Sequence, residues 1–298
     1  MVPNRPQSWQ NCDTDIREFI QEVVSSTAAV LGEELTGVYL HGSLAMGSYY
    51  RPKSDIDLLV VVKSSLGTDS RKEIAELFAS LAERRPTVGN LEASVVTNQA
   101  VKDFKHPCPF EVHYSSEWHE KIKQGTVGFS ENNTDADLAS HVLYVVKRGI
   151  TLDGQEIEDV FSPISWSYFV AAILDDFDWI VTDENILKTP FYSILNICRV
   201  IQTLSQKEQN VFSKDEGGEW GLRMVPAQYK ESIEKALLVY RSSRELTYSQ
   251  RRQGGVSWDK KQLLKLRDYA RKEVENILKK PALSNIKKYV EVTNNDKN

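Results

Sequence analysis

One segment, residues 36–62, constrains this chain more than any other. The apolar run Val38 to Leu40 ends in Gly42-Ser43, a short polar stretch follows, and Asp55-Ile56-Asp57 then leads directly into the β-branched run Leu58 to Val62. This pattern predicts two strands joined by a polar connection. Because side chains alternate along a strand, Asp55 and Asp57 are expected on the same face, with their carboxylates close together.

The two aspartates indicate a metal site. Neighbouring carboxylates raise each other's pKa unless a cation lies between them, and Mg²⁺ takes one or two carboxylates together with phosphate oxygens. Gly42 lets the backbone approach a ligand closely, and the N–H and hydroxyl of Ser43 suit a phosphate group. The segment therefore predicts metal-assisted chemistry on a nucleoside triphosphate. The alternative is a solvated turn followed by a strand whose acids cap an edge of the sheet.

This order of Gly-Ser, a short connection and Asp-x-Asp at the start of an apolar strand resembles the nucleotidyltransferase superfamily typified by DNA polymerase β. The resemblance implies adenylyl transfer, in which a substrate oxygen attacks the α-phosphate of ATP in line. It also implies two Mg²⁺ ions held by Asp55 and Asp57, which neutralise charge on the attacking and leaving oxygens.

The attacking hydroxyl must also lose its proton, and Glu92 is the predicted base. It lies in the next predicted strand, Asn90–Thr97, where burial would raise its pKa to a useful value. Glu92 is also expected among the metal ligands. Glu111, on the following strand, is the competing candidate for the base, or it contacts the site residues without touching the substrate. The structural alternative is that Glu92 is an ordinary glutamate of an edge strand with no part in catalysis.

Apolar spacing predicts an α/β half and a helical half. In order, the pattern predicts a helix after Asp13 or Thr14, the two strands above, a helix Ser70–Arg84, strands Asn90–Thr97 and Pro109–Tyr114, and a helix Asp135–Lys147. Strands then nearly vanish, and helices are expected at Ser165–Ile180, Phe191–Ser205, Ala227–Ser243 and Trp258–Lys279, with a loop at Arg251–Gly255.

The predicted fold class is therefore α+β. An N-terminal nucleotidyltransferase α/β domain with a mixed sheet takes residues 1–157, and a C-terminal all-helical bundle takes residues 158–298. The polar tail after Glu291 is expected to fray.

Properties of the whole chain narrow its partners. The net charge of −5 argues against a nucleic-acid substrate and suits a cationic small molecule. The three cysteines lack the spacing of zinc ligands, and no secretory leader or membrane-length apolar run occurs. We therefore expect a cytoplasmic monomer with reduced thiols that binds neither nucleic acid nor membrane.

The rest of the chain resembles a narrower family, the aminoglycoside adenylyltransferases that modify streptomycin and spectinomycin. Glu92 lies in a strand of the family's form, and Glu117-Trp118 falls where the family has Gly-Glu-Trp, with Ser116 replacing the glycine. The most specific match consists of Ser213-Lys214-Asp215, Trp220, Val225-Pro226-Ala227-Gln228-Tyr229 and Tyr240, at the family's spacings. The resemblance covers residues 30–245.

The resemblance implies that Lys214 and Tyr240 contact the phosphates of ATP, with the active site in a cleft between the domains. Trp118 would pack on the ring system of the drug, and Asp183 is the candidate carboxylate for its cationic groups. The drug-reading segment departs from the family, because Lys188-Thr189-Pro190-Phe191 replaces the expected acidic run. Helix capping by Asp183, core packing by Trp118 and Tyr240, and an ordinary helix-start lysine are the structural alternatives.

Other functions fit the sequence less well. An RNA-terminal nucleotidyltransferase would carry a basic groove interleaved with aromatics, but Arg84-Arg85 and Arg251-Arg252 are isolated pairs. A fused toxin–antitoxin pair would need a histidine in its helical half, and none follows His141. A silent ATP-binding sensor would lack a metal acid.

We therefore expect Mg²⁺-dependent transfer of AMP from ATP to a hydroxyl of an aminoglycoside-type antibiotic, with release of pyrophosphate and resistance as the outcome. The drug is spectinomycin, streptomycin or both, and the choice of drug and hydroxyl stays open. The alternative is a nucleotidyltransferase that acts on another small molecule or on an RNA end.

Overall fold

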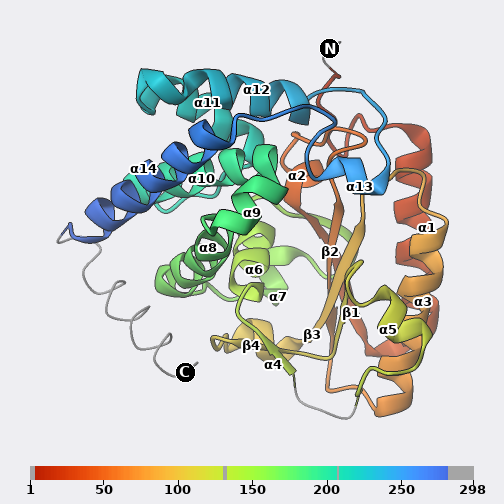
Figure 1. The fold of residues 1–298 in the computed structure, drawn as a ribbon. Coiled ribbons are helices and arrows are strands. Elements are labelled where there is room, and N and C mark those ends of the chain that lie inside the picture. Colours follow the sequence, from red (N-terminus) through yellow and green to blue (C-terminus); the bar gives the residue numbers. More distant parts are fainter. Residues whose placement is uncertain (1–3, 130–132, 207, 281–298) are drawn as a thin grey trace. The chain divides into compact units, whose positions relative to one another are not determined.

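A computed structural model describes residues 4–129, 133–206 and 208–280, so the tail after Glu291 lies outside the described residues. The described residues divide into two compact units (Figure 1): one lies within Pro6–Ile164, and the other comprises Asn4, Arg5 and the described residues from Ser165 onward. Val160 and Phe161, which follow the predicted boundary at residue 157, pack into a core of the first unit.

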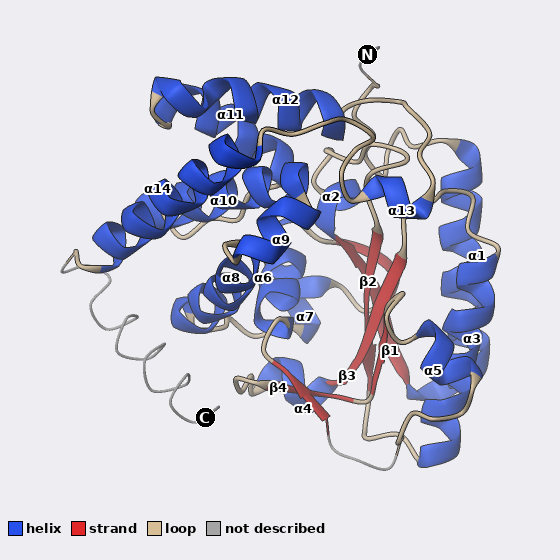
Figure 2. Ribbon diagram, in the orientation of Figure 1, coloured by secondary structure: helices blue, strands red, loops and turns tan. Residues whose placement is uncertain are grey.

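The first unit is built on a five-stranded sheet in the order β5-β3-β2-β1-β7 (Figure 2). The strands are β1 (Leu35–His41), β2 (Ile56–Val62), β3 (Leu91–Thr97), β5 (Val112–Tyr114) and β7 (Ile150–Gly154). Only the β2–β3 pair is parallel, so the sheet is mixed, as predicted. A separate two-stranded sheet joins β4 (Cys108–Phe110) to β6 (Asn133–Asp135).

Two sequence predictions in this unit were wrong in detail. The predicted strand Pro109–Tyr114 is two short strands in different sheets, because β4 pairs with β6 while β5 pairs with β3. The helix predicted from Asp135 begins at Leu138, because Asp135 belongs to β6 and Asp137 occupies the N-cap position of the helix. The edge strand β7 was not predicted.

Helices cover both faces of the large sheet (Figure 1). On one face lie α1 (Thr14–Leu31) and α3 (Thr68–Glu83), and on the other lie α6 (Leu138–Arg148), α4 (Asn98–Lys102) and α7 (Ile157–Val160). Alternate strand residues therefore enter different cores, which explains the continuous apolar runs of β1 and β2. The short elements α2 (Gly42–Ala45), α5 (His119–Lys123) and the 3₁₀ turn Gly32–Glu34 complete the unit.

The second unit is helical, as predicted, and the α+β class is confirmed. Its elements are α8 (Trp166–Ile180), α9 (Asp183–Lys188), α10 (Pro190–Ser205), α11 (Lys214–Met224), the 3₁₀ turn Ala227–Tyr229, α12 (Lys230–Tyr240), α13 (Tyr248–Arg251) and α14 (Lys260–Leu278). The predicted helix Ala227–Ser243 is therefore shorter, since its first turn is 3₁₀. Arg251 ends α13, and only the rest of the predicted loop is a turn.

Helix α10 forms the centre of this unit, and α11 packs closely against it. Added Cβ atoms would stand 2.8 Å from the Arg199 backbone at Gly217, 2.8 Å from Leu195 at Gly218 and 2.6 Å from Cys198 Sγ at Gly221. These glycines permit the close packing of the two helices.

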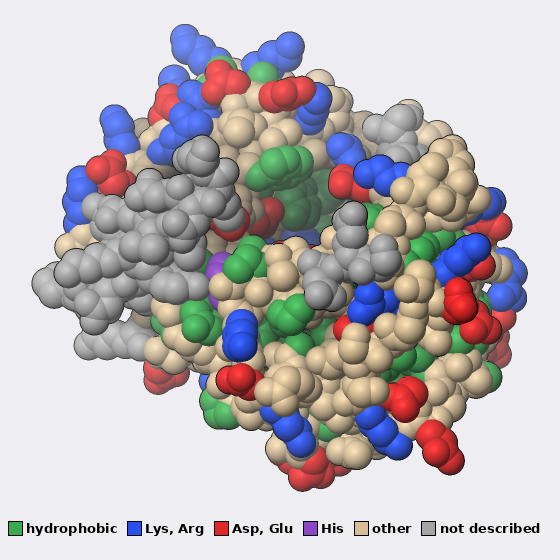
Figure 3. All heavy atoms as spheres, turned by 90° about the horizontal axis from the view of Figure 1, so that it is seen from below, with side chains coloured by type: hydrophobic (Ala, Val, Ile, Leu, Met, Phe, Trp, Pro, Cys, Tyr) green, Lys and Arg blue, Asp and Glu red, His purple; other side chains and the backbone are tan. Residues whose placement is uncertain are grey.

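Among the described residues, no helix combines the length and apolar character needed to cross a membrane. On the face drawn in Figure 3, Lys and Arg side chains lie interspersed with Asp and Glu side chains, and the described part of this face carries no continuous basic stripe.

Candidate active site

The predicted motif residues meet where β1 ends and β2 begins. The two strands are antiparallel, and their register places His41 opposite Asp57. Helix α2 follows at once with Gly42 and the buried Ser43, and Gly42 has φ of +66°. A Cβ on Gly42 would lie 1.8 Å from Asp57 Oδ2, so only glycine leaves room for this carboxylate.

Glu92 lies beside Asp57 on the neighbouring strand. The parallel β2–β3 register pairs Asp57 with Glu92, so both side chains project from the same face of the sheet. Asp55 Oδ1 accepts a 2.5 Å hydrogen bond from the N–H of Asn90, just before β3. The structure therefore brings Gly42, Asp55, Asp57 and Glu92 to one end of the sheet.

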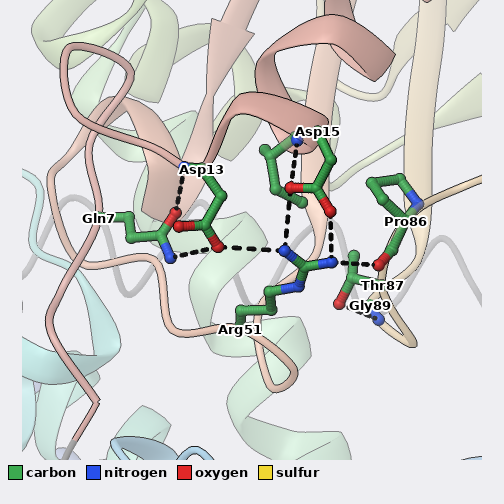
Figure 4. A network of polar contacts seen from close by, with 8 residues as sticks. Gln7, Asp13, Asp15, Arg51, Pro86, Thr87 and Gly89 are labelled. Atoms are coloured by element: carbon green, nitrogen blue, oxygen red, sulfur yellow. Dashed lines mark hydrogen bonds and ion pairs between the residues drawn. The ribbon is translucent and has the colours of Figure 1, made fainter.

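Arg51 fixes the two loops that lead into these strands (Figure 4). Its guanidinium binds Asp15 through two hydrogen bonds of 2.7 and 3.0 Å and Asp13 at 3.1 Å. It also donates a 2.5 Å hydrogen bond to the carbonyl of Pro86, in the loop before β3. Arg51 thus ties the connection before Asp55 to the start of α1 and to the approach of Glu92.

The environment of Glu92 raises its pKa to about 8. Burial is the main cause; Asp57, Asp137 and Asp55 add to it, while His141 opposes it. A carboxylate with a pKa near neutrality is suited to general-base work at physiological pH.

Helix α6 presents His141 to this face. Its Nε2 lies 3.8 Å from Glu92 Oε1 and 3.2 Å from Asp137 Oδ2. Burial lowers the pKa of His141, but Asp137 and Glu92 outweigh burial and raise it to about 10. The ring of His41 lies 4.8 Å from that of His141, and its pKa is well below the ordinary value because it is buried and faces a charged neighbour.

Glu111, the competing base candidate, is held elsewhere. Its Oε2 accepts hydrogen bonds from Arg71 Nε at 2.9 Å and from the Leu66 N–H at 2.8 Å. Leu66 follows the C-terminal end of β2, whereas Asp57 lies near its N-terminal end. Glu111 therefore forms a structural ion pair with Arg71, at the other end of β2 from the aspartates.

Trp118 lies in the same unit as Glu92. Its partly buried ring packs against the core beneath α1 and α3 and lies 6.1 Å from the ring of His113. His113 Nδ1 is 2.9 Å from the hydroxyl of Ser94, two residues beyond Glu92 on the same face of β3. The drug contact of Trp118 stays a prediction.

Lys214 and Tyr240 both lie in the helical unit. Lys214 begins α11 with its Nζ 5.3 Å from the centre of the Tyr192 ring, and buried Tyr240 ends α12 against Phe191. Arg241 joins the two helices by binding Asp215 at 2.7 and 2.9 Å. A role for Lys214 and Tyr240 in ATP binding remains a prediction.

Asp183 lies in the first turn of α9, where Thr182 is the N-cap. Its exposed carboxylate forms an ion pair with Arg267 of α14. Asp183 is therefore not the helix cap, and its structural role is the ion pair with Arg267. A contact between Asp183 and a substrate stays a prediction.

The donor set fits a magnesium ion that arrives with a nucleotide. The described residues contain no group of three His, Cys, Asp or Glu side chains arranged to hold a metal ion. Asp55 and Asp57 are half-exposed oxygen donors, and Asn90, next to them, has a buried side-chain oxygen without a hydrogen-bond partner. Because Mg²⁺ is usually bound by one or two carboxylates plus substrate phosphates, two aspartates suffice.

No sequence pattern singled out Arg51, Asn90, Asp137 or His141. Arg51 lies in the polar connection between the two halves of the motif, and that position is its only sequence signal. His141 is far from Glu92 along the chain and comes near it only because α6 covers that face of the sheet.

Comparison with known proteins finds one family match in the N-terminal part of the chain and another in the C-terminal part. Residues 17–107 match the family described as "Nucleotidyltransferase domain", and residues 159–264 match "Aminoglycoside adenylyltransferase, C-terminal domain". A spectinomycin 9-adenylyltransferase of Staphylococcus aureus is 27% identical over 215 residues, which cover 71% of this chain and 80% of that protein.

Two further relatives extend the match. A spectinomycin 9-adenylyltransferase of Campylobacter jejuni is 23% identical over 89% of this chain and 99% of its own length. An aminoglycoside (3'') (9) adenylyltransferase of Escherichia coli is 24% identical over 78% and 87%. The fold is similar to that of an Enterococcus spectinomycin adenyltransferase solved with ATP and spectinomycin, with a TM-score of 0.69, 21% identity, and coverage of 87% and 99%.

Proposed function

Because this chain belongs to the aminoglycoside adenylyltransferase family, we propose that it transfers AMP from ATP to a hydroxyl of spectinomycin, streptomycin or both, and so confers resistance. One observation favours catalytic AMP transfer over ATP binding without catalysis. The Asp57 carboxylate over Gly42 lies in register with Glu92, whose raised pKa suits a base.

In the proposed reaction, the drug hydroxyl oxygen forms a bond to the α-phosphorus of ATP, and the bond from that phosphorus to the bridging oxygen breaks. Pyrophosphate leaves with the bonding electrons, and the hydroxyl proton passes to Glu92. Asp55 and Asp57 would hold Mg²⁺, with Glu92 as a further oxygen donor. The ion would supply charge neutralisation at the phosphates.

The remaining residues would bind the substrates. Gly42 and Ser43 would contact the nucleotide phosphates through the start of α2, and Lys214 and Tyr240 would add contacts from the helical unit. Trp118 is the proposed platform for the drug rings, and Asp183 a carboxylate for its cationic groups. The net charge of −5 supports a cationic acceptor over RNA.

Pyrophosphate release tests the proposal. Wild type would be assayed with Mg²⁺–ATP and, separately, spectinomycin, streptomycin, kanamycin, lincomycin and a short RNA, beside Glu92→Gln. Glu18→Gln, on the exposed side of α1, is the control. Release with spectinomycin or streptomycin that falls to a low residual rate only in Glu92→Gln is the expected result.

Other outcomes point elsewhere. Release with RNA would overturn the antibiotic assignment. ATP binding without pyrophosphate release in the presence of any of these acceptors would favour a different small-molecule acceptor or a non-catalytic ATP sensor. Expression in a susceptible bacterium, with wild type against Glu92→Gln, tests whether transfer confers resistance.

A further inference from the structure

We propose that His141, held by Asp137, is a positioning residue that orients the Glu92 carboxylate toward the attacking hydroxyl. The inference rests on the proposed function, since it assigns a partner to the proposed base. It concerns residues that neither the motif nor the family resemblance singled out.

The three side chains form a chain of close contacts. His141 Nε2 is 3.2 Å from Asp137 Oδ2 and 3.8 Å from Glu92 Oε1, so one ring nitrogen faces both carboxylates. Exposure falls from Asp137 (55%) to Glu92 (34%) to His141 (12%). The imidazole is thus the least exposed of the three side chains and lies between two more accessible acids.

The supporting contacts fix Asp137 and the imidazole ring. Asp137 Oδ1 accepts a 2.6 Å hydrogen bond from the hydroxyl of Ser140, which leaves Oδ2 for His141. On the sheet side, the ring of His41 lies 4.8 Å from that of His141 at an angle of 42°. His41 itself is opposite Asp57 in the sheet. The His141 ring is therefore confined between Asp137 and β1.

Glu92 needs such a partner because the other groups around it are acidic. Asp57 lies in register with Glu92, and Asp55 is on the same face of β2. Like charges on β2 push the Glu92 side chain away from them. The side chain that reaches Glu92 from α6 is the imidazole of His141, whose Nε2 lies 3.8 Å from Glu92 Oε1. Because a displacement of about 1 Å can lower a rate about 100-fold, a lateral contact of this kind matters to catalysis.

The test compares His141→Gln and Asp137→Asn with His119→Gln. His119 is a matched control, because its Nε2 lies 3.6 Å from Glu83 Oε1 in the same unit, away from Glu92. For His141→Gln we expect kcat to fall about 10- to 100-fold while KM for ATP and drug stays within about twofold. Asp137→Asn keeps the shape of the side chain and an oxygen that accepts the Ser140 hydrogen bond, so its kcat should fall less. His119→Gln should keep wild-type kinetics.

Repeating His141→Gln in the Glu92→Gln background separates positioning from structure. If His141 acts through Glu92, the second substitution adds no further loss of rate, and the shifts of Tm for the two residues are non-additive. A further loss of equal size in the Glu92→Gln background, or a change in KM alone, would overturn the inference. Absence of transfer by wild type to every acceptor would instead overturn the proposed function, and the positioning role with it.

Discussion

Gly42 shows how a single residue can determine the geometry of the candidate site. Its φ is +66°, and a methyl group at this position would clash with Asp57 Oδ2, so there is no room for a side chain. Backbone strain and steric exclusion of the carboxylate act at the same position, and a control substitution can separate them.

We predict that Gly42→Ala abolishes AMP transfer, because its methyl group displaces Asp57, and that it also lowers stability by about 1 kcal/mol through the positive φ. Gly32→Ala is the matched control: Gly32 has φ of +51°, and nothing lies within 4 Å of its Cβ position. Both variants should lose similar stability in thermal melts, and only Gly42→Ala should lose activity. Normal turnover by Gly42→Ala would contradict the close approach of Asp57.

The three free cysteines differ in accessibility, which gives a second prediction at this scale. Burial raises the pKa of Cys108 and of Cys198 to about 12, whereas Cys12 is only half-buried. At pH 8 a thiol with a pKa of about 12 is about 0.01% thiolate, so it reacts slowly. A colorimetric thiol reagent should modify Cys12 first in the native protein, and the other two after unfolding. Rapid modification of Cys198 in the native protein would show that the helical core opens.

At the scale of the elements, glycines of α11 let this helix pack closely against α10. In a solvent-exposed helix, replacing glycine by alanine stabilises by about 1 kcal/mol. At Gly217 the new methyl would meet the backbone of Arg199, which cannot rotate away.

We therefore predict that Gly217→Ala lowers the free energy of unfolding by about 1–3 kcal/mol, against the sign of helix propensity. Arg223→Ala, at an exposed position of the same helix, should change it by less than about 0.5 kcal/mol. Urea unfolding followed by circular dichroism makes the comparison, and a stabilised Gly217→Ala would show that α11 moves freely away from α10.

The helices and strands also show how much of the fold could be predicted from the sequence. Strands β1, β2 and β3 and helices α8, α10 and α14 were predicted because their apolar spacing is regular. Glu92 was expected in the strand after Asp55 and Asp57, and its register with Asp57 is a finding of the structure. Strand β7 is too short and exposed to give a pattern, and the glycines of α11 dilute its helical signal. Arg51, Asp137 and His141 could not be found, because their contacts depend on how distant segments pack.

For the whole molecule, the two aspartates imply that metal and nucleotide bind together. We predict that ATP with Mg²⁺ raises Tm by several degrees, because a ligand at 100 times its Kd stabilises the folded state by about 2.7 kcal/mol. ATP with a chelator should raise Tm less. Asp57→Asn should lose the Mg²⁺-dependent part of the shift, while Asp103→Asn, an exposed control, should keep it. An equal shift with and without Mg²⁺ would argue against metal ligation by Asp57.

The place of β7 has a consequence for how this chain is made. Gly37, near the start of β1, pairs with Gly154, so β1 gains its second neighbour from a strand that is synthesised long afterwards. A ribosome that has not yet released residues 150–154 holds a nascent chain in which β1 can pair with β2 but keeps its other edge open. Open edges recruit other strands. The first unit is therefore most exposed to misassociation during translation, in the interval before β7 emerges.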